Sequence, residues 1–248
     1  MHRLLAIGLT CLVAAAASAD VTYWQADPSQ PDNWFLPWNW TAGVPCPDDR
    51  ALIENGGTAI IGIRTRTDPS DSESWHGAAA WTLEIGGRRG GAVSQIWLHA
   101  DFTRGLYISA PANVRATYKL SGGSLSAGRI QLGYEYEVGE FAQTGGTART
   151  DRLTVGAWPC CWPDPSADLY LPPSRFTLVG GEFDAGTAAI GTAAIGRAVL
   201  EGGILTVRDL LTIGGPRPWP PIDRPVLMEP EPVDPPVGEA DISIYLPP

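Results

Sequence analysis

The sequence predicts an all-β chain, a single-stranded parallel β-helix (β-solenoid) with coils of about 22 residues. Two observations lead to this prediction: a phrase of about sixteen residues occurs four times, and within it apolar residues alternate with polar or small ones. In addition, no segment after Ala19 has the periodicity of an amphipathic helix. A β-sandwich is the alternative fold, but it does not require glycine pairs at regular intervals.

The four copies of the phrase span residues 118–133, 141–156, 176–191 and 198–214, the last with one extra residue. Each copy contains a Gly-Gly pair that supplies a turn with positive φ, and the pairs begin at Gly122, Gly145, Gly180 and Gly202. Each copy closes on an apolar residue followed by glycine; these apolar residues are Leu132, Val155, Ile190 and Ile213. We expect the turns to stack at equivalent corners and the four apolar residues to form one inward ladder.

The Gly-Gly pairs begin 23, 35 and 22 residues apart, so the long interval holds one period plus an insertion. Two Pro/Trp-rich insertions, 157–173 and 216–238, each follow a closing glycine and are expected to leave the same corner of the stack. Insertions on one face of a solenoid often form its binding face. Their exposed aromatics would stack on sugar rings or dock a partner, and the candidate binding residues are Trp158, Trp162 and Trp219. Packing of each loop on itself is the alternative.

Weaker copies upstream, such as the apolar runs around the glycine turn in 51–61, extend the predicted solenoid over residues 51–248. Residues 20–50 form an entry segment rich in tryptophan. A solenoid end must be covered against aggregation, so we expect this segment to cap the first coil. Its tryptophans are Trp24, Trp34, Trp38 and Trp40.

Residues 1–19 have the pattern of a secretory signal peptide, with a basic start, an apolar run and a small-residue A-S-A motif before Asp20. Cleavage there leaves 229 residues with a formal charge of −11, because Arg3 is the only Asp, Glu, Lys or Arg residue in the removed peptide. The chain is therefore expected to be secreted, with no membrane span after signal removal. The acidity argues against nucleic acid as a partner.

Three cysteines remain after processing, and the secretory route permits a disulfide between Cys46 and either Cys160 or Cys161. Sequence does not decide between the two pairings, and the odd count leaves one thiol over. These cysteines and the two remaining histidines have no zinc-site spacing, so no metal and no cofactor are expected.

Residues 33–61 place Trp34, Asn39-Trp40, Gly43 to Pro45, Asp48-Asp49 and Ile53 to Gly56 in a characteristic order. This order resembles the opening of secreted bacterial β-solenoid proteins with autotransporter-passenger-like repeats, of the planctomycete and exosortase-sorted (PEP-CTERM) type. The resemblance covers most of the mature chain and implies a solenoid surface protein. It implies no activity, and the sorting helix of that class has no counterpart here.

Two acidic clusters are candidate sites. Asp68, Asp71, Glu73 and His76 offer oxygen ligands for calcium, but they lack the spacing of a known calcium loop, and a solvated loop is the better interpretation. Glu135, Glu137 and Glu140 flank two tyrosines and would suit glycosidic hydrolysis only if one acid were buried. We expect no Asp, Arg, Lys or His cluster that recurs at matching positions, and the sequence therefore predicts no catalytic residue.

The sequence therefore favours a non-enzymatic structural and adhesive scaffold of the cell surface or matrix, with extracellular glycans or other surface proteins as partners. The rivals are a carbohydrate-binding module and a polysaccharide-active β-helix enzyme, either a lyase or a glycosidase. The motif Y-L-P-P precedes the third copy and recurs at the last residues, which predicts that the chain is the N-terminal portion of a longer protein. A natural stop in a Pro-rich tail is the alternative.

Overall fold

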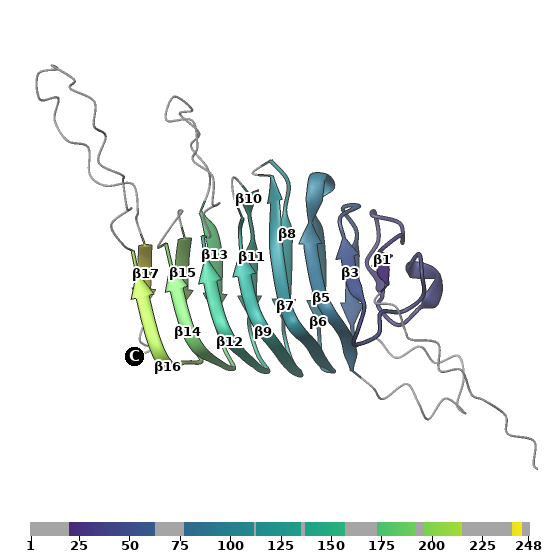
Figure 1. Ribbon diagram of the computed structural model, residues 1–248. Helices are drawn as coiled ribbons and strands as arrows, with labels where there is room; N and C mark the ends of the chain where they lie inside the picture. Colours follow the sequence, from purple (N-terminus) through teal and green to yellow (C-terminus); the bar gives the residue numbers. More distant parts are fainter. Residues whose placement is uncertain are drawn as a thin grey trace, which may run out of the picture.

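The computed structural model describes residues 20–62, 77–111, 113–134, 137–156, 173–191, 196–214 and the backbone of 240–244. Within these residues the chain is all-β, and its strands form two parallel sheets that face each other across one apolar core (Figure 1). Successive strands alternate between the sheets for most of the chain. The prediction of an all-β chain built from parallel strands is confirmed.

One sheet contains the longest strands and is called the long-strand sheet. Its strands in spatial order are β1 (Val21–Tyr23), β3 (Arg50–Ile53), β5 (Ala78–Gly86), β7 (His99–Pro111), β9 (Ser124–Leu132), β12 (Thr147–Val155), β14 (Glu182–Ile190) and β16 (Ile204–Ile213). The short β10 (Glu137–Val138) pairs antiparallel with the end of β7.

The other sheet is called the short-strand sheet, and its strands follow one another in the same chain order. Its strands are β2 (Asp32–Asn33), β4 (Thr58–Ile61), β6 (Gly91–Gln95), β8 (Ala116–Leu120), β11 (Glu140–Gln143), β13 (Ser174–Leu178), β15 (Gly196–Leu200) and β17 (Ala240–Ile244). Two 3₁₀ turns, η1 (Pro37–Asn39) and η2 (Gly87–Arg89), are the helical elements of the described residues.

Each copy of the repeated phrase spans the end of a short strand, the Gly-Gly turn and the following long strand. The four long strands β9, β12, β14 and β16 pair side by side, so the copies are neighbours in space as well as in sequence. Val155 is paired with both Leu132 and Ile190, and Ile190 is paired with Ile213. The closing apolar residues of the four copies are therefore paired with one another, as the sequence predicted.

The extra residue of the fourth copy is absorbed by an irregularity in β16. The register between β14 and β16 shifts by one residue after Ala185, which pairs with Val207, whereas Thr187 pairs with Leu210. The shift lies near Arg208 and Asp209, and pairing on both sides of it is regular. A bulge accommodates an inserted residue in this way without loss of the flanking ladder.

The ladder faces inward, but its members are not equally buried. Leu132, Val155 and Ile190 are fully buried, whereas Ile213 is 47% exposed. Among the described strands of the long-strand sheet, none pairs with β16 on its far side. The expected ladder is therefore buried at three of its four members, and the exposed member lies on the strand that has a neighbour on one side only among the described strands.

The Gly-Gly turns of successive copies lie on top of one another, with too little space between their backbones for a Cβ atom. Positive φ falls on the second glycine of each pair, with φ 73° at Gly146, and a Cβ built there would lie 2.5 Å from the carbonyl oxygen of Gly123 in the preceding turn. The first glycines are equally restricted, because a Cβ on Gly145 would lie 2.5 Å from the Ser121 carbonyl oxygen. Both conformation and space thus require glycine here.

The long strands bend near their middle. In β9 the inward residues Leu125 and Ala127 are followed by two outward-facing residues, Gly128 and Arg129, before Ile130 points inward again. The same change of phase occurs in β12, where Asp151 and Arg152 face outward together. The outer surface of the sheet therefore has a ridge, called the corner, at this position of successive strands.

Aromatic side chains stack along the core from repeat to repeat. The rings of Tyr118, Phe141 and Phe176 hold equivalent positions on β8, β11 and β13, with neighbouring centroids 5.6 Å apart and nearly parallel planes. Phe183 meets the Phe176 ring edge-on at 4.8 Å. Offset and edge-on pairs of this kind each add about 0.5–1.5 kcal/mol beyond burial.

The N-terminal end of the stack is closed by three tryptophans of the entry segment. Trp24, Trp34 and Trp40 are buried and meet edge-on, and Trp34 also approaches Phe102 of β7. The indole Nε1 of Trp40 donates a 2.8 Å hydrogen bond to the carbonyl oxygen of Trp34. Trp38, in contrast, is exposed.

Candidate functional site

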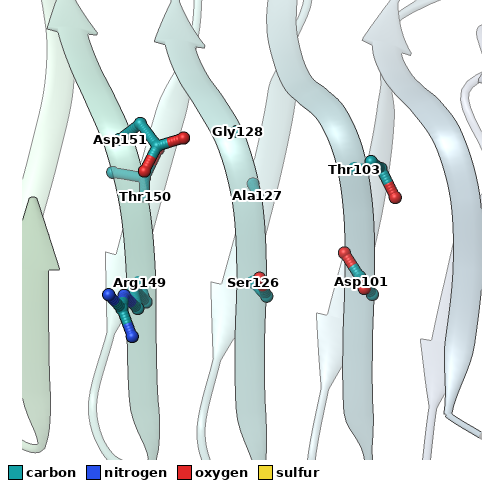
Figure 2. Close-up of a pocket in the computed structure, with 8 residues that line it drawn as sticks. All are labelled: Asp101, Thr103, Ser126, Ala127, Gly128, Arg149, Thr150 and Asp151. Atoms are coloured by element: carbon teal, nitrogen blue, oxygen red, sulfur yellow. The ribbon is translucent and has the colours of Figure 1, made fainter.

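The outer face of the long-strand sheet is hollowed over β9. Figure 2 shows this depression, whose volume is about 250 Å³ and which extends over three neighbouring strands. Asp101 and Thr103 of β7 lie on one side, and Arg149 and Asp151 of β12 lie on the other. The lining residues are Asp101, Thr103, Ser126, Ala127, Gly128, Arg149, Thr150 and Asp151.

The hollow results from a contrast in side-chain size between neighbouring repeats. The first copy of the phrase has S-A-G over Ser126 to Gly128, whereas the second has Arg149 to Asp151 in the same register. On the outer face of the middle strand, the small side chain of Ser126 and the lack of a side chain at Gly128 leave a floor between longer side chains on β7 and β12. Gly128 is also required for close approach at the corner, because a Cβ there would lie 2.6 Å from the Thr103 carbonyl oxygen.

Charged side chains on this face are partly paired with one another. Asp101, Ser126, Arg149 and Asp184 occupy one outward row across β7, β9, β12 and β14. Asp184 accepts a 3.0 Å hydrogen bond from Arg208 Nε and lies 4.0 Å from Arg149 Nε. Because these pairs are exposed, they contribute little to the stability of the sheet. Their effect is to orient Arg149 toward Asp184 and away from the floor of the depression.

The depression offers hydroxyls, carboxylates and one guanidinium in an open, shallow setting. This inventory suits hydrogen bonding to a polar ligand such as a sugar hydroxyl. Acid–base catalysis at a glycosidic bond usually requires a carboxyl group whose environment is apolar and enclosed. Asp151 is exposed, so the arrangement fits binding better than bond cleavage.

Three clear pKa shifts in the described residues lie outside the depression. Hydrogen bonds from Ser29 lower the pKa of the Asp27 carboxyl, and the Glu84 carboxylate raises the pKa of Arg50, whose Nε donates to it at 2.6 Å. Burial raises the pKa of Tyr118, whose hydroxyl donates to Gln95 Oε1. Each of these groups has a structural partner.

The structure separates the glutamates that the sequence placed together. Glu137 lies on β10, where its carboxylate accepts a 2.6 Å hydrogen bond from the Ser109 hydroxyl. Glu140 begins β11 in the short-strand sheet and is paired in register with Arg175. Glu135 lies outside the described residues. Glu137 and Glu140 therefore lie on different strands, and the Glu137 carboxylate is engaged by Ser109.

Several sequence-based candidates lie outside the described residues: Trp158, Trp162, Trp219, Cys160, Cys161, and the cluster Asp68, Asp71, Glu73 and His76. Cys46 is exposed, and its thiol is free in the described part of the chain. Within that part, no three His, Cys, Asp or Glu side chains lie close enough to hold a metal ion.

The structure brings together arginines that the sequence analysis missed. Arg129 and Arg152 are paired in register on β9 and β12, so basic residues do recur at matching positions, contrary to the expectation. The signal was present in the sequence, because each is the fourth residue before the closing glycine of its copy. Thr187 holds that place in the third copy, which hid the pattern.

Comparison with protein-family models, with curated proteins and with solved structures finds no significant match to this chain. The helices of the described residues are short turns, and none is long and apolar enough to cross a membrane.

Proposed function

We propose that this chain is a parallel β-solenoid that serves as a secreted, non-enzymatic scaffold with an adhesive role at the cell surface or in the extracellular matrix. The observation that supports this proposal is the continuous register. From β5 to β15 nearly every strand pairs in parallel with the equivalent strand of the repeat before and the repeat after. Such an arrangement forms a long surface with repeated side-chain rows rather than one enclosed site.

The energetics of the stack support a structural role. Each repeat contributes residues such as Phe141 and Leu153 that are buried only because neighbouring repeats cover them. A stack of this kind gains stability with every added repeat, and it presents its outer faces at fixed intervals. Fixed spacing suits adhesion, in which many weak contacts are made at once.

Secretion can be tested with the full chain carrying a C-terminal epitope in a bacterial host. We expect the epitope in the extracytoplasmic fraction and an N-terminus at Asp20 in the recovered protein. The matched control is Leu9→Arg, which places a charge in the apolar run of the signal and should hold the protein in the cytoplasm with Met1 retained. Recovery of the unchanged chain in the cytoplasm, with Met1 retained, would overturn the proposal.

A polysaccharide-active enzyme is the second candidate, because Asp101 and Asp151 line opposite sides of the depression, although they lie in different rows. Paired carboxylates on either side of a glycosidic bond are the usual apparatus of its hydrolysis. Incubation of the purified mature chain with pectin, alginate and neutral glucans distinguishes the two functions. We expect no reducing sugar to be released. Release that is lost in both Asp101→Asn and Asp151→Asn would establish the enzyme instead.

A further inference from the structure

Three arginines line the corner of the long-strand sheet on consecutive strands. They are Arg104 of β7, Arg129 of β9 and Arg152 of β12, and together they are called the arginine ladder. Arg129 and Arg152 are directly paired. Arg104 lies beside them, because a Cβ built on Gly128 would lie 3.0 Å from the carbonyl oxygen of Arg104. Neighbouring strands are about 4.8 Å apart, so the ladder repeats at that interval.

The positive charge of the ladder is not neutralised by ion pairs within the described residues. Other arginines on this sheet have such partners: Arg50 pairs with Glu84, and Arg208 pairs with Asp184. No ion pair joins Arg104, Arg129 or Arg152 to an acid in the described part of the chain, although Asp151 is adjacent in sequence to Arg152. The ladder thus places three cations side by side on a chain whose net charge is −10.

The fold does not require arginine at these positions. Like charges directly opposite each other destabilise a sheet. The next strand, β14, has Thr187 in register with Arg152 and continues the same ladder of backbone pairs. Threonine is well suited to an exposed strand position, so the stack itself is compatible with the neutral residue. A function other than folding therefore accounts best for the paired arginines.

An exposed tryptophan ends the ladder on its N-terminal side. Trp81 of β5 is 40% exposed, and the Arg104 guanidinium carbon lies 4.6 Å from the centre of its ring. The cation–π contact holds Arg104 at the corner. The part of the indole that remains exposed offers an apolar surface at the end of a row of cations.

We propose that the arginine ladder binds a linear anionic polysaccharide whose carboxylate or sulfate groups lie along the stack. A guanidinium matches either group with two parallel hydrogen bonds, and the regular spacing of the strands presents one such fork per repeat. Asp101 lines the adjacent depression and repels anionic groups from it, which directs such a ligand along the corner. Duplex DNA is a poorer fit, because three cations on an acidic protein neutralise few phosphates.

This inference rests on the proposed adhesive scaffold and names the chemistry of its ligand. The test uses the purified mature chain with immobilised alginate, which carries carboxylates, dextran sulfate, which carries sulfates, dextran, which is neutral, and duplex DNA. The test variant is Arg129→Thr/Arg152→Thr, which installs the residue that β14 already holds. The control variant is Arg115→Thr/Arg175→Thr, which removes the same charge from exposed positions outside the long-strand sheet.

We expect the wild-type chain to bind at least one anionic probe and not dextran, with affinity that falls as salt increases. The ladder variant should bind at least about tenfold more weakly, since each lost charge-assisted contact is large relative to the free energy of a tenfold change. The control variant should bind like the wild type. Melting curves of all three proteins verify that each is folded.

Three results would overturn the inference: no binding of either anionic probe, equal weakening in the control variant, or equally tight binding of duplex DNA. Preference for one anionic probe would support it and identify the anionic group. Export of the epitope-tagged chain is measured separately. Loss of export with intact probe binding would contradict the scaffold proposal alone, whereas normal export without probe binding would contradict the ladder alone.

Discussion

At the N-terminal end of the stack, apolar side chains are covered by the entry segment, whereas at β16 similar side chains remain exposed. Trp34 and Trp40 lie against each other with centroids 4.7 Å apart and are almost fully buried. Leu210 of β16 is 61% exposed, and Leu211 and Ile213 are about half exposed. In β14 the residues paired with Leu211 and Ile213, which are Ala188 and Ile190, are buried.

This difference shows where the stability of the stack originates. Ile190 and Ile213 are the same residue type in the same register, yet one contributes a fully buried side chain and the other does not. A strand in such a stack cannot bury its own apolar residues; the next repeat or a capping segment must do so. The comparison leads to predictions of graded effects on stability.

The largest effect is expected for Trp34→Ala at the N-terminal end. Truncation of a fully buried tryptophan removes its contacts with Trp40 and Phe102 and leaves a cavity. The free energy of unfolding should fall by about 3–5 kcal/mol. Urea unfolding followed by tryptophan fluorescence and by circular dichroism measures this value. Trp38→Ala is the control, because that side chain is exposed and its loss should have little effect.

The matched pair Ile190→Ala and Ile213→Ala tests the comparison directly. Ile190→Ala should destabilise the protein by about 2–5 kcal/mol, because a cavity forms between two repeats. Ile213→Ala should cost less than about 1 kcal/mol, because solvent already reaches nearly half of the side chain. Equal losses in urea unfolding would mean that Ile213 is covered in solution.

A smaller effect is expected at high pH from the buried Tyr118. Burial raises the pKa of its hydroxyl above the ordinary value of about 10, so the folded state keeps the proton that the unfolded state releases. The contribution of Tyr118 to stability is therefore complete below pH 10 and is lost as pH rises through the folded-state pKa. The wild-type free energy of unfolding should fall above pH 10 by up to about 1.4 kcal/mol per pH unit from this residue.

The variant Tyr118→Phe should lack this part of the pH dependence. At pH 8 it should be less stable by about 1–3 kcal/mol, because the buried Gln95 Oε1 loses its donor. Tyr23→Phe is the control, since Tyr23 of the N-terminal strand is 42% exposed. An unchanged slope above pH 10 in Tyr118→Phe would show that other groups determine the alkaline transition.

The repeated phrase was sufficient to predict parallel strands and their register. Glycine pairs mark the turns, and once the turns are aligned the apolar positions of Leu132, Val155 and Ile190 follow. The depression was not predictable, because it depends on the difference in side-chain size between three adjacent strands. The complete arginine ladder was not predictable either, because β7 has three residues at the corner where β9 has two, which displaces Arg104 from the repeat alignment.

The smallest predicted changes in the free energy of unfolding concern two arginines, one at the corner of the inner repeats and one at the corner of β16. Arg152 is paired with Arg129, so Arg152→Thr removes a repulsion and should raise the free energy of unfolding by about 0.2–1 kcal/mol at low salt. Arg208 of β16 donates a hydrogen bond to Asp184, so Arg208→Thr should lower it by a similar amount. Both differences should shrink in 1 M salt, where the Debye length is about 3 Å. Urea unfolding at two salt concentrations measures both differences.

A loss of stability in Arg152→Thr would mean that the arginine stabilises the stack, and the case for a ligand-binding role would then weaken.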